Sequence, residues 1–355
     1  MKVLVIQQKM IGDVLLSSIL FEALNDKFPG AELHFLIRKN TLPVVAGNPY
    51  IHTIILDRED ELGKKLNFIA FLSRLRKERY YAVIDVYSKI GSALLTYGTH
   101  AKVRVGRKKW YTWFLYTTTK DYQNTPKSIV GKAIQFRMDL LRPLGIAGEQ
   151  TYRPKISLAP EEKEVAKKFM VQSGVNLSRP IVMCSVLGSS INKSYPLAHF
   201  AEVLKTIVAT SDVQLLFNYL PSQHDRVEEL LGLCDPKVKS RVIRSCYATS
   251  LRQFISIASF CDVLIGNEGG AVHMAKAVDV PTFAIFSPQI QKETWINEES
   301  DKDVAVHIND YKPELFDNLA EKKDVLAANE RLYTAFSPDH FQPLLVDFLK
   351  KNINK

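Results

Sequence analysis

The chain has 355 residues, enough for about two domains of ordinary size, each with its own buried core. Hydrophobic residues make up 46% and charged residues 24%, with 16 Gly and 16 Pro, and this balance excludes disordered, collagen-like and low-complexity chains. No stretch reaches the roughly 18 apolar residues that span a bilayer, and the apolar run at the start is too short for a signal peptide. The four cysteines have no CxxC spacing, so we expect a reduced, cytoplasmic protein.

The charge is distributed unevenly along the chain. Residues 1–160 contain 25 Lys and Arg against 13 Asp and Glu, a balance of +12. Residues 161–355 contain 22 and 25, a balance of −3, which brings the whole chain to +9. The asymmetry indicates an acidic partner for the first half: nucleic acid, an anionic membrane or a phosphorylated substrate. The alternative is that the extra cations only make the surface soluble.

The first half alternates between strand and helix patterns. Helical spacing of apolar residues predicts helices over 15–24 and 68–77. Continuous apolar or β-branched runs predict strands at 3–6, 32–37, 52–56 and 82–86. Strands separated by helix-length segments indicate βαβ units and therefore a mostly parallel, doubly wound sheet.

Proline and glycine cluster without periodicity between residues 143 and 160, as is typical of a linker. The pattern then restarts, with predicted strands at 181–184, 213–217, 263–265 and 282–286 and predicted helices at 197–208, 225–231, 251–260 and 272–277. We therefore expect an α/β protein of two consecutive doubly wound domains. Residues 289–330 show no clear pattern, whereas Ser337 and Pro338 predict the start of a last helix with an apolar stripe.

In open α/β sheets, ligands bind beyond the carboxyl ends of the strands, so three strand-to-helix loops are the candidates for a site. The first loop ends with Gly12 and Asp13 at the start of a helix. Asp13 could simply cap that helix. It could instead be a general base at the rim of a cleft, with Gly12 allowing a substrate to approach closely.

The second loop contains Ser189, Ser190 and Lys193 ahead of the helix at 197–208. Hydroxyls, exposed backbone N–H groups and a lysine at a helix start suit a phosphate, although the loop lacks the Walker pattern. An ordinary polar loop is the alternative.

The third loop contains Glu268, Gly269 and Gly270, followed by His273. A Gly-Gly pair that opens a helix lets backbone amides approach an anion. No GxGxxG occurs, so a dinucleotide fingerprint is not supported. His273 could be a satisfied helical histidine or a ligand contact.

Other catalytic patterns are missing from the sequence: there is no GxSxG, no HExxH and no cluster of Cys and His at metal-ligand spacing. Asp301 and Asp303 formally match the acid-x-acid pattern of metal-dependent sugar transferases. They lie in a charged segment rather than after a clear strand, so we expect no metal site.

Residues 102–116 combine five cations with five aromatic side chains. This mixture suits a membrane interface, where aromatic rings sit at the level of the headgroups. It also suits nucleic acid, or a buried aromatic strand flanked by solvated lysines. The candidate patch consists of Arg104, Arg107, Lys108, Lys109, Trp110 and Trp113.

Several of these segments together resemble one family. Residues 11–16 (IGDVLL) and 28–33 (FPGAEL) resemble the opening of glycosyltransferase family 9, the lipopolysaccharide heptosyltransferases. Residues 193–201 (KSYPLAHFA) resemble its K-x-W-P-x-x-x-F-A element. Residues 250–281, with Gly-x-x-His-Met-Ala, resemble its donor-site signature. The likeness runs in register over about residues 1–290.

The resemblance implies a GT-B fold, in which two Rossmann-like domains face a central cleft and the last helix returns to the first domain. The implied divisions are an acceptor domain at 1–155, a nucleotide-sugar donor domain at 160–335 and a returning helix at 336–355. The basic first half fits this arrangement, because a phosphorylated lipid A core is strongly anionic.

The resemblance also implies roles for the candidate residues. Asp13 matches the family's catalytic base, which deprotonates the acceptor hydroxyl for in-line attack at the anomeric carbon and inverts its configuration. Lys193, with Ser189 and Ser190 nearby, would neutralise the departing diphosphate, so that protein groups rather than a metal handle its charge. The implied donor-binding residues are Gly12, Ser189, Ser190, Asp225, Glu268, Gly269, Gly270 and His273.

The implied partners are an ADP-heptose donor, with no further cofactor, and an anionic lipid-linked acceptor, but no nucleic acid. The implied location is the cytoplasmic face of the inner membrane, as a peripheral protein. Two segments depart from the pattern: the family's Asp-Ser/Thr-Gly-Pro is Glu268-Gly269-Gly270-Ala271 here, and Tyr195 replaces the tryptophan. A GT-B nucleotide-sugar epimerase, and a degenerate protein that only binds a sugar nucleotide or anionic lipid, are therefore the alternatives.

Overall fold

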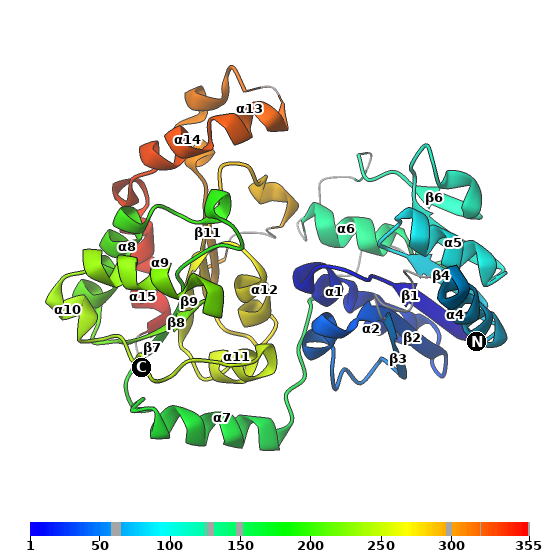
Figure 1. The fold of residues 1–355 in the computed structure, drawn as a ribbon, viewed down its shortest axis with the longest axis horizontal. Helices are drawn as coiled ribbons and strands as arrows, with labels where there is room; N and C mark the ends of the chain where they lie inside the picture. The colour runs from blue at the N-terminus through cyan, green and yellow to red at the C-terminus, as the bar shows by residue number, and fades with distance from the viewer. Residues whose placement is uncertain are drawn as a thin grey trace. The chain divides into compact units, whose positions relative to one another are not determined.

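The computed structural model describes residues 1–57, 65–123, 125, 131–146, 152–295, 300–319 and 321–353. These form two compact units, Met1–Ser157 and Leu158–Lys355 (Figure 1). Each unit is built on one sheet whose recorded strand pairings are all parallel. The α/β class and the Rossmann-like winding predicted from the sequence are confirmed.

The first unit has six strands in the order β3-β2-β1-β4-β5-β6. The strands are β1 (Lys2–Ile6), β2 (Glu32–Arg38), β3 (Thr53–Asp57), β4 (Ala82–Asp85), β5 (Val103–Arg107) and β6 (Thr118–Lys120). The helices are α1 (Ile11–Ser17), α2 (Ile19–Lys27), α4 (Lys65–Lys77), α5 (Ile90–Gly98) and α6 (Lys132–Asp139). The 3₁₀ helices are η1 (Lys39–Val44), η2 (Trp113–Leu115) and η3 (Arg142–Leu144).

The second unit has five strands in the order β11-β10-β9-β7-β8. The strands are β7 (Ile181–Ser185), β8 (Gln214–Asn218), β9 (Val263–Asn267), β10 (Thr282–Ile285) and β11 (Asp303–Val306). The helices are α7 (Pro160–Gln172), α8 (Leu197–Thr210), α9 (His224–Leu233), α10 (Pro236–Lys239), α11 (Leu251–Ala258), α12 (Gly270–Lys276), α13 (Lys322–Ala327), α14 (Asn329–Ala335) and α15 (Gln342–Ile353). The 3₁₀ helices are η4 (Ile191–Lys193), η5 (Pro221–Gln223), η6 (Lys292–Thr294), η7 (Ile308–Asp310), η8 (Pro313–Phe316) and η9 (Pro338–His340).

The central strands form because their side chains are buried on both faces of the sheets. Val3, Leu4, Val5 and Ile6 of β1 are all fully buried, which explains the continuous apolar run in the sequence. Gly266 in β9 permits a close approach to the neighbouring strand. Its φ is +140°, and a Cβ there would lie 2.3 Å from the Ser185 carbonyl oxygen of β7.

One helix prediction needs correction. The helix expected over 15–24 is two helices, α1 and α2, which meet at Ser18. The Ser18 hydroxyl donates to the Leu15 carbonyl at 2.7 Å, a side-chain contact that competes with the regular helical bonding. The last helix, α15, packs its apolar stripe within the second unit.

The apolar stripe of α15 explains its location. Leu345, Phe348, Leu349 and Ile353 belong to the buried core of the second unit. This core also contains residues of α8, the helix with which α15 makes extensive contact. Because that stripe is already covered inside the second unit, α15 belongs to it.

Candidate functional site

Asp13 lies in the first turn of α1, at the carboxyl end of β1 in the first unit. One of its carboxylate oxygens, Oδ1, accepts a hydrogen bond from Nη2 of Arg137 at 2.7 Å. Arg137 is on α6, and its side chain is only 6% exposed, against 32% for Asp13. Asp13 is therefore an accessible carboxylate with one oxygen fixed by a buried cation.

Arg137 is itself held in place by three further contacts. Its Nη1 donates to the Ala133 carbonyl at 2.8 Å, and its Nε donates to the Ser17 hydroxyl at 3.1 Å. Its Nη2 also reaches the Asp13 carbonyl at 3.4 Å. A guanidinium with such partners has a fixed orientation, so it also fixes the carboxylate that it binds. Sequence reasoning missed Arg137, because no local pattern links it to Asp13.

A buried carboxylate, Asp85, ends β4 in the same sheet. It accepts hydrogen bonds from the Ser88 N–H at 2.7 Å and from the Tyr116 hydroxyl at 2.8 Å. Burial raises its pKa to about 6, although these hydrogen bonds favour the charged form. Lys109 donates to the Ser88 carbonyl, and burial together with the neighbouring Lys89 lowers the pKa of the Lys109 ammonium.

The basic and aromatic patch is partly buried and partly exposed. Trp110 and Trp113 are 87% and 57% exposed, and Lys108 is exposed as well. Arg104 is half-buried and donates to the Ala101 and Leu115 carbonyls. Arg107 lies over the ring of Tyr122 at 4.6 Å. The exposed tryptophans do not fit the expectation of a wholly buried aromatic strand.

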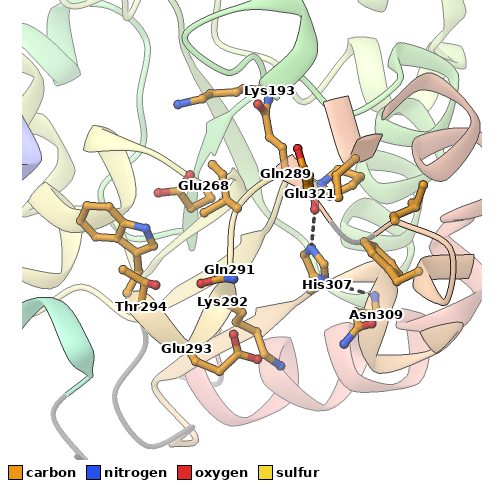
Figure 2. A pocket seen from close by; sticks show the side chains of 16 residues that line it. Lys193, Glu268, Gln289, Gln291, Lys292, Glu293, Thr294, His307, Asn309 and Glu321 are labelled. Atoms are coloured by element: carbon orange, nitrogen blue, oxygen red, sulfur yellow. Dashed lines mark hydrogen bonds between the residues drawn. The ribbon is translucent and has the colours of Figure 1, made fainter. Parts of the chain in front are cut away.

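The second unit contains a cavity of about 730 Å³ (Figure 2). It is lined by Lys193, Glu268, Pro288, Gln289, Ile290, Gln291, Lys292, Glu293, Thr294, Trp295, His307, Asn309, Phe316, Leu319, Glu321 and Val325. Lys193 and Glu268 lie on one side of it, and His307 and Asn309 lie on the other. Its volume and mixed polar and apolar lining suit a ligand of the size of a sugar nucleotide.

Lys193 and Glu268 form the electrostatic centre of this cavity. The Glu268 side chain is 10% exposed. Burial raises the pKa of its carboxyl, and the positive charge of Lys193 opposes part of this rise. His273 lies beside them, with its Nε2 3.8 Å from Glu268 Oε1 and its ring centroid 5.3 Å from that of Trp295. The second and third candidate loops thus meet at one cavity.

The backbone around Lys193 determines where its side chain lies. The Gly188 N–H donates to the Ser194 hydroxyl at 3.0 Å, and a Cβ on Gly188 would lie 2.1 Å from the Lys193 carbonyl oxygen. The Tyr195 N–H donates to Oδ1 of Asn267 at 2.6 Å, which ties the loop to the end of β9. Tyr195 itself is fully buried, and its hydroxyl donates to the Phe336 carbonyl.

The other predicted donor residues do not line this cavity. Ser189 and Ser190 are exposed on the loop before Lys193, and Asp225 is exposed in the first turn of α9. They nevertheless share the carboxyl edge of the sheet, because their loops follow the parallel strands β7 and β8. A hydrogen bond of 2.8 Å from Gln223 Nε2 to the Gly188 carbonyl joins the two loops. Gly269 and Gly270, at the start of α12, are half-buried beside Glu268.

Much of the cavity wall comes from the segment that the sequence left without a pattern. This segment contains η6, β11, η7 and η8. His307 is buried, which lowers its pKa, and its ring approaches the Pro288 carbonyl at 3.4 Å. The wall residues of this segment are of unlike types and have no regular spacing, so no sequence pattern identifies them.

Within the described ranges, no group of three or more His, Cys, Asp or Glu side chains could hold a metal ion. Asp301 pairs with Lys351 at 2.8 Å, and Asp303 pairs with Lys276 at 3.3 Å. The described helices also include none whose length and apolar character would carry it across a bilayer.

A family model described as "Glycosyltransferase family 9 (heptosyltransferase)" matches residues 68–323, which is more than half of the sequence. The chain belongs to glycosyltransferase family 9. The resemblance carried by the sequence motifs is therefore confirmed, and the protein is a glycosyltransferase by family.

Curated relatives agree with this assignment. The lipooligosaccharide heptosyltransferase 2 of Haemophilus influenzae is 22% identical over 303 residues, covering 81% of this chain and 84% of the relative. The lipopolysaccharide heptosyltransferase 2 of Salmonella typhimurium is 23% identical over 296 residues, covering 81% and 83%.

Solved structures show the same fold. A family 9 glycosyl transferase from Veillonella parvula has a TM-score of 0.72 at 17% identity, covering 94% of this chain and 97% of that one. The ADP-heptose LPS heptosyltransferase II of E. coli has a TM-score of 0.70 at 20% identity, covering 94% and 99%. The GT-B fold is thus confirmed. Nothing in these comparisons favours the epimerase alternative.

Proposed function

We propose that this glycosyltransferase moves heptose from ADP-heptose onto the inner core of a lipopolysaccharide, with inversion at the anomeric carbon. The proposal is carried by the cavity that Lys193 and the buried Glu268 both line, in a chain that belongs to family 9. The names of the curated relatives, which are lipopolysaccharide and lipooligosaccharide heptosyltransferases, support the donor and the acceptor.

Asp13 is the proposed general base. Its Oδ1 is held by Arg137, which leaves Oδ2 to take the proton of the acceptor hydroxyl. The acceptor oxygen then forms a bond to the anomeric carbon, while the bond from that carbon to the diphosphate oxygen breaks. The electron pair leaves with the diphosphate, so ADP is the second product.

Lys193 is the proposed partner of the leaving diphosphate, because its ammonium is half-buried at the cavity and can offset the charge that develops on the oxygen. Ser189, Ser190 and the amides at Gly269–Gly270 would add hydrogen bonds to the phosphates. In the same proposal Asp225 binds the ribose, and Gly12 allows the donor to approach closely.

Glu268 and His273 are proposed to bind hydroxyl groups of the donor sugar. Burial and the proximity of Lys193 suit Glu268 to a neutral, hydroxyl-rich ligand rather than a second anion. The acceptor is proposed to be anionic and anchored in lipid, and the protein to work peripherally at the cytoplasmic membrane face. The patch of Arg104, Arg107, Lys108, Lys109, Trp110 and Trp113 supports this part of the proposal.

Replacement of the proposed base tests the reaction. In Asp13→Ala, turnover should fall by about a thousandfold, because a positioned base contributes roughly 10²- to 10⁴-fold. Calorimetry should show ADP affinity within about twofold of wild type, since Lys193 and Glu268 belong to the other unit and keep their contacts. Transfer is followed as ADP release from ADP-heptose with a purified core acceptor.

Two further variants make the result specific. In Arg137→Met, turnover should fall by roughly 10- to 100-fold at unchanged donor KM, because Asp13 loses its fixed orientation. Glu22→Ala on α2, whose carboxylate lies 3.5 Å from the exposed Lys155 ammonium, is the matched control and should retain activity. Wild-type turnover in Asp13→Ala would remove the assigned base. Donor binding without any product, in the wild-type enzyme, would favour a non-catalytic binding protein.

A further inference from the structure

One stretch of the first unit is free of acidic residues. Residues 86–120 contain seven Lys and Arg and no Asp or Glu. The stretch runs from the end of β4 through α5 and β5 to β6, and it includes η2. No acidic residue of this stretch therefore offsets the charge of its seven cations.

Helix α5 carries an exposed apolar stripe in the middle of this stretch. Ile90, Leu94 and Tyr97 are 59%, 42% and 50% exposed, and their spacing of four and then three residues puts them on one side of the helix. The opposite side is already packed, because Ser92, Leu95 and Thr96 are buried. The apolar stripe of α5 is thus exposed, while the other side of the helix is packed into the unit.

The 3₁₀ helix η2 extends this apolar surface. Trp113 and Phe114 are 57% and 60% exposed. Leu115, the next residue, is buried in a small cluster with Ala93 of α5, and η2 contacts α5. The exposed rings of η2 therefore lie on a segment that is anchored to the helix carrying the stripe.

Helix α4 lies beside α5 and adds to the surface (Figure 1). The two helices pack closely because Gly98 leaves room for Leu72, whose Cδ atoms would lie 2.6 Å from a Cβ there. Ile69 of α4 is 55% exposed, and Arg74 and Arg76 are exposed on the same helix. We call the surface of Ile69, Ile90, Leu94, Tyr97, Trp113 and Phe114 the α5 face.

Cations lie against the aromatic rings at its border. Arg104 lies 5.6 Å from the ring centroid of Tyr97, and Lys102 lies 5.9 Å from that of Tyr81. Lys108, five residues before η2 in the chain, is exposed. Apolar side chains with a cationic border match the interface of an anionic bilayer, where rings enter the headgroup region and cations meet lipid phosphates.

We propose that the α5 face is the surface by which this protein docks on an anionic membrane, with α5 lying in the plane of the interface. A second copy of the chain fits less well, because a two-fold contact through this face would bring two cationic borders together. The proposal names the surface and the lipid class of the membrane contact that the proposed function includes. It rests on the proposed function only in that a lipid-anchored acceptor gives the protein a reason to bind a membrane.

Vesicle binding without donor or acceptor tests the docking separately from catalysis. The probe is large unilamellar vesicles of phosphatidylcholine with about 30 mol% phosphatidylglycerol, compared with phosphatidylcholine alone. We expect the full chain to bind the anionic vesicles at least about tenfold more tightly, and brominated lipid to quench the fluorescence of the exposed tryptophans.

Three variants identify the surface. Ile90→Gln with Leu94→Gln and Tyr97→Gln should weaken binding by about tenfold or more, because the apolar stripe is lost. Lys102→Glu with Lys108→Glu should weaken binding to anionic vesicles by at least about fivefold. Val165→Gln with Val171→Gln and Leu233→Gln, three exposed apolar residues of the second unit, is the matched control and should bind as wild type.

The outcomes separate docking from transfer. The α5 triple variant should keep wild-type transfer to a short, water-soluble acceptor, whereas failure of the proposed function would remove transfer from every variant. Wild-type vesicle binding by the triple variant, or no binding by the wild-type protein, would overturn the proposal. A dimer in sedimentation that the triple variant abolishes, with vesicle binding unaffected, would assign the face to a second copy instead.

Discussion

Asp13 and Arg137 illustrate how an exposed carboxylate acquires a fixed orientation. Surface ion pairs usually contribute little to folding stability, because both side chains lose conformational freedom and water screens the charges. Here the arginine is buried and bonded at Ala133 and Ser17, so its order is already set by the packing of α6 against α1. The Asp13 carboxylate therefore accepts a hydrogen bond from a guanidinium that is already held in place. This contact also sets the direction in which the second carboxylate oxygen points.

Asp85 is a carboxylate whose burial should make stability depend on pH. Its pKa is raised to about 6 in the folded chain, against 3.8 for the ordinary group. Between these values the native state binds the proton more tightly than the unfolded chain, so stability falls as pH rises from about 4 to 6 and is level above that. The total loss is about 3 kcal/mol.

The variant Asp85→Asn cannot lose a proton and should lack this dependence. We expect its free energy of unfolding, relative to wild type, to rise by about 2 kcal/mol between pH 4 and pH 7, whatever the constant cost of the substitution itself. Urea unfolding of both proteins at several pH values measures the difference. A difference that stays constant over this range would show that the buried carboxylate keeps an ordinary pKa.

At the scale of elements, the loop that carries Lys193 depends on a glycine that is not catalytic. In Gly188→Ala, the new Cβ would lie 2.1 Å from the Lys193 carbonyl oxygen, so η4 must move. The donor KM should rise by about tenfold or more. The overpacking should also lower the stability by about 1–3 kcal/mol. Kinetics with varied ADP-heptose and a thermal melt measure both effects.

Gly232 near the end of α9 provides the matched control, because nothing lies within 4 Å of its Cβ position. Gly232→Ala should leave the donor KM unchanged and raise the stability by at most about 1 kcal/mol, since alanine is the better helix former. If Gly188→Ala binds the donor like wild type, the position of Lys193 does not control donor binding.

The elements that could be predicted from the sequence are those whose pattern is local. β1 and β4 are buried on both faces, so their runs of apolar residues are sufficient to identify them. β11 has only four residues and begins with Asp303 at the edge of its sheet, where an apolar run is not required. The packing of α15 could not be predicted either, because an apolar stripe does not specify its partner.

The candidate site likewise contains residues that a local sequence pattern identifies and residues that only the tertiary packing brings in. Asp13, Lys193 and Glu268 were identified because each follows a predicted strand, and ligands bind at that edge. Arg137 is 124 residues from Asp13 in the chain, so their ion pair exists only through the packing of α6 on α1. The cavity wall likewise joins Glu268 to residues such as His307 and Phe316, which no spacing rule connects.

At the scale of the whole molecule, the uneven charge of the sequence coincides with the division into two units. No charged residue lies between positions 158 and 160, so the balance of +12 belongs to Met1–Ser157 and that of −3 to the second unit. In the proposed function, the basic unit would attract an anionic acceptor over several ångströms, whereas the donor would be held by short contacts in the cavity. The two substrates should therefore respond differently to salt.

Raising the salt concentration should weaken acceptor binding more than donor binding. The screening length falls from about 10 Å at 0.1 M salt to about 3 Å at 1 M, so attraction from the whole basic unit is lost while contacts at Lys193 persist. We expect kcat/KM for a soluble anionic acceptor to fall about tenfold over this range, and the donor KM to change by less than about threefold. Lys102→Glu with Lys108→Glu should flatten the acceptor dependence, whereas Lys167→Glu with Lys168→Glu, on α7 of the second unit, should not. Equal salt dependence for both substrates would mean that the basic unit does not attract the acceptor.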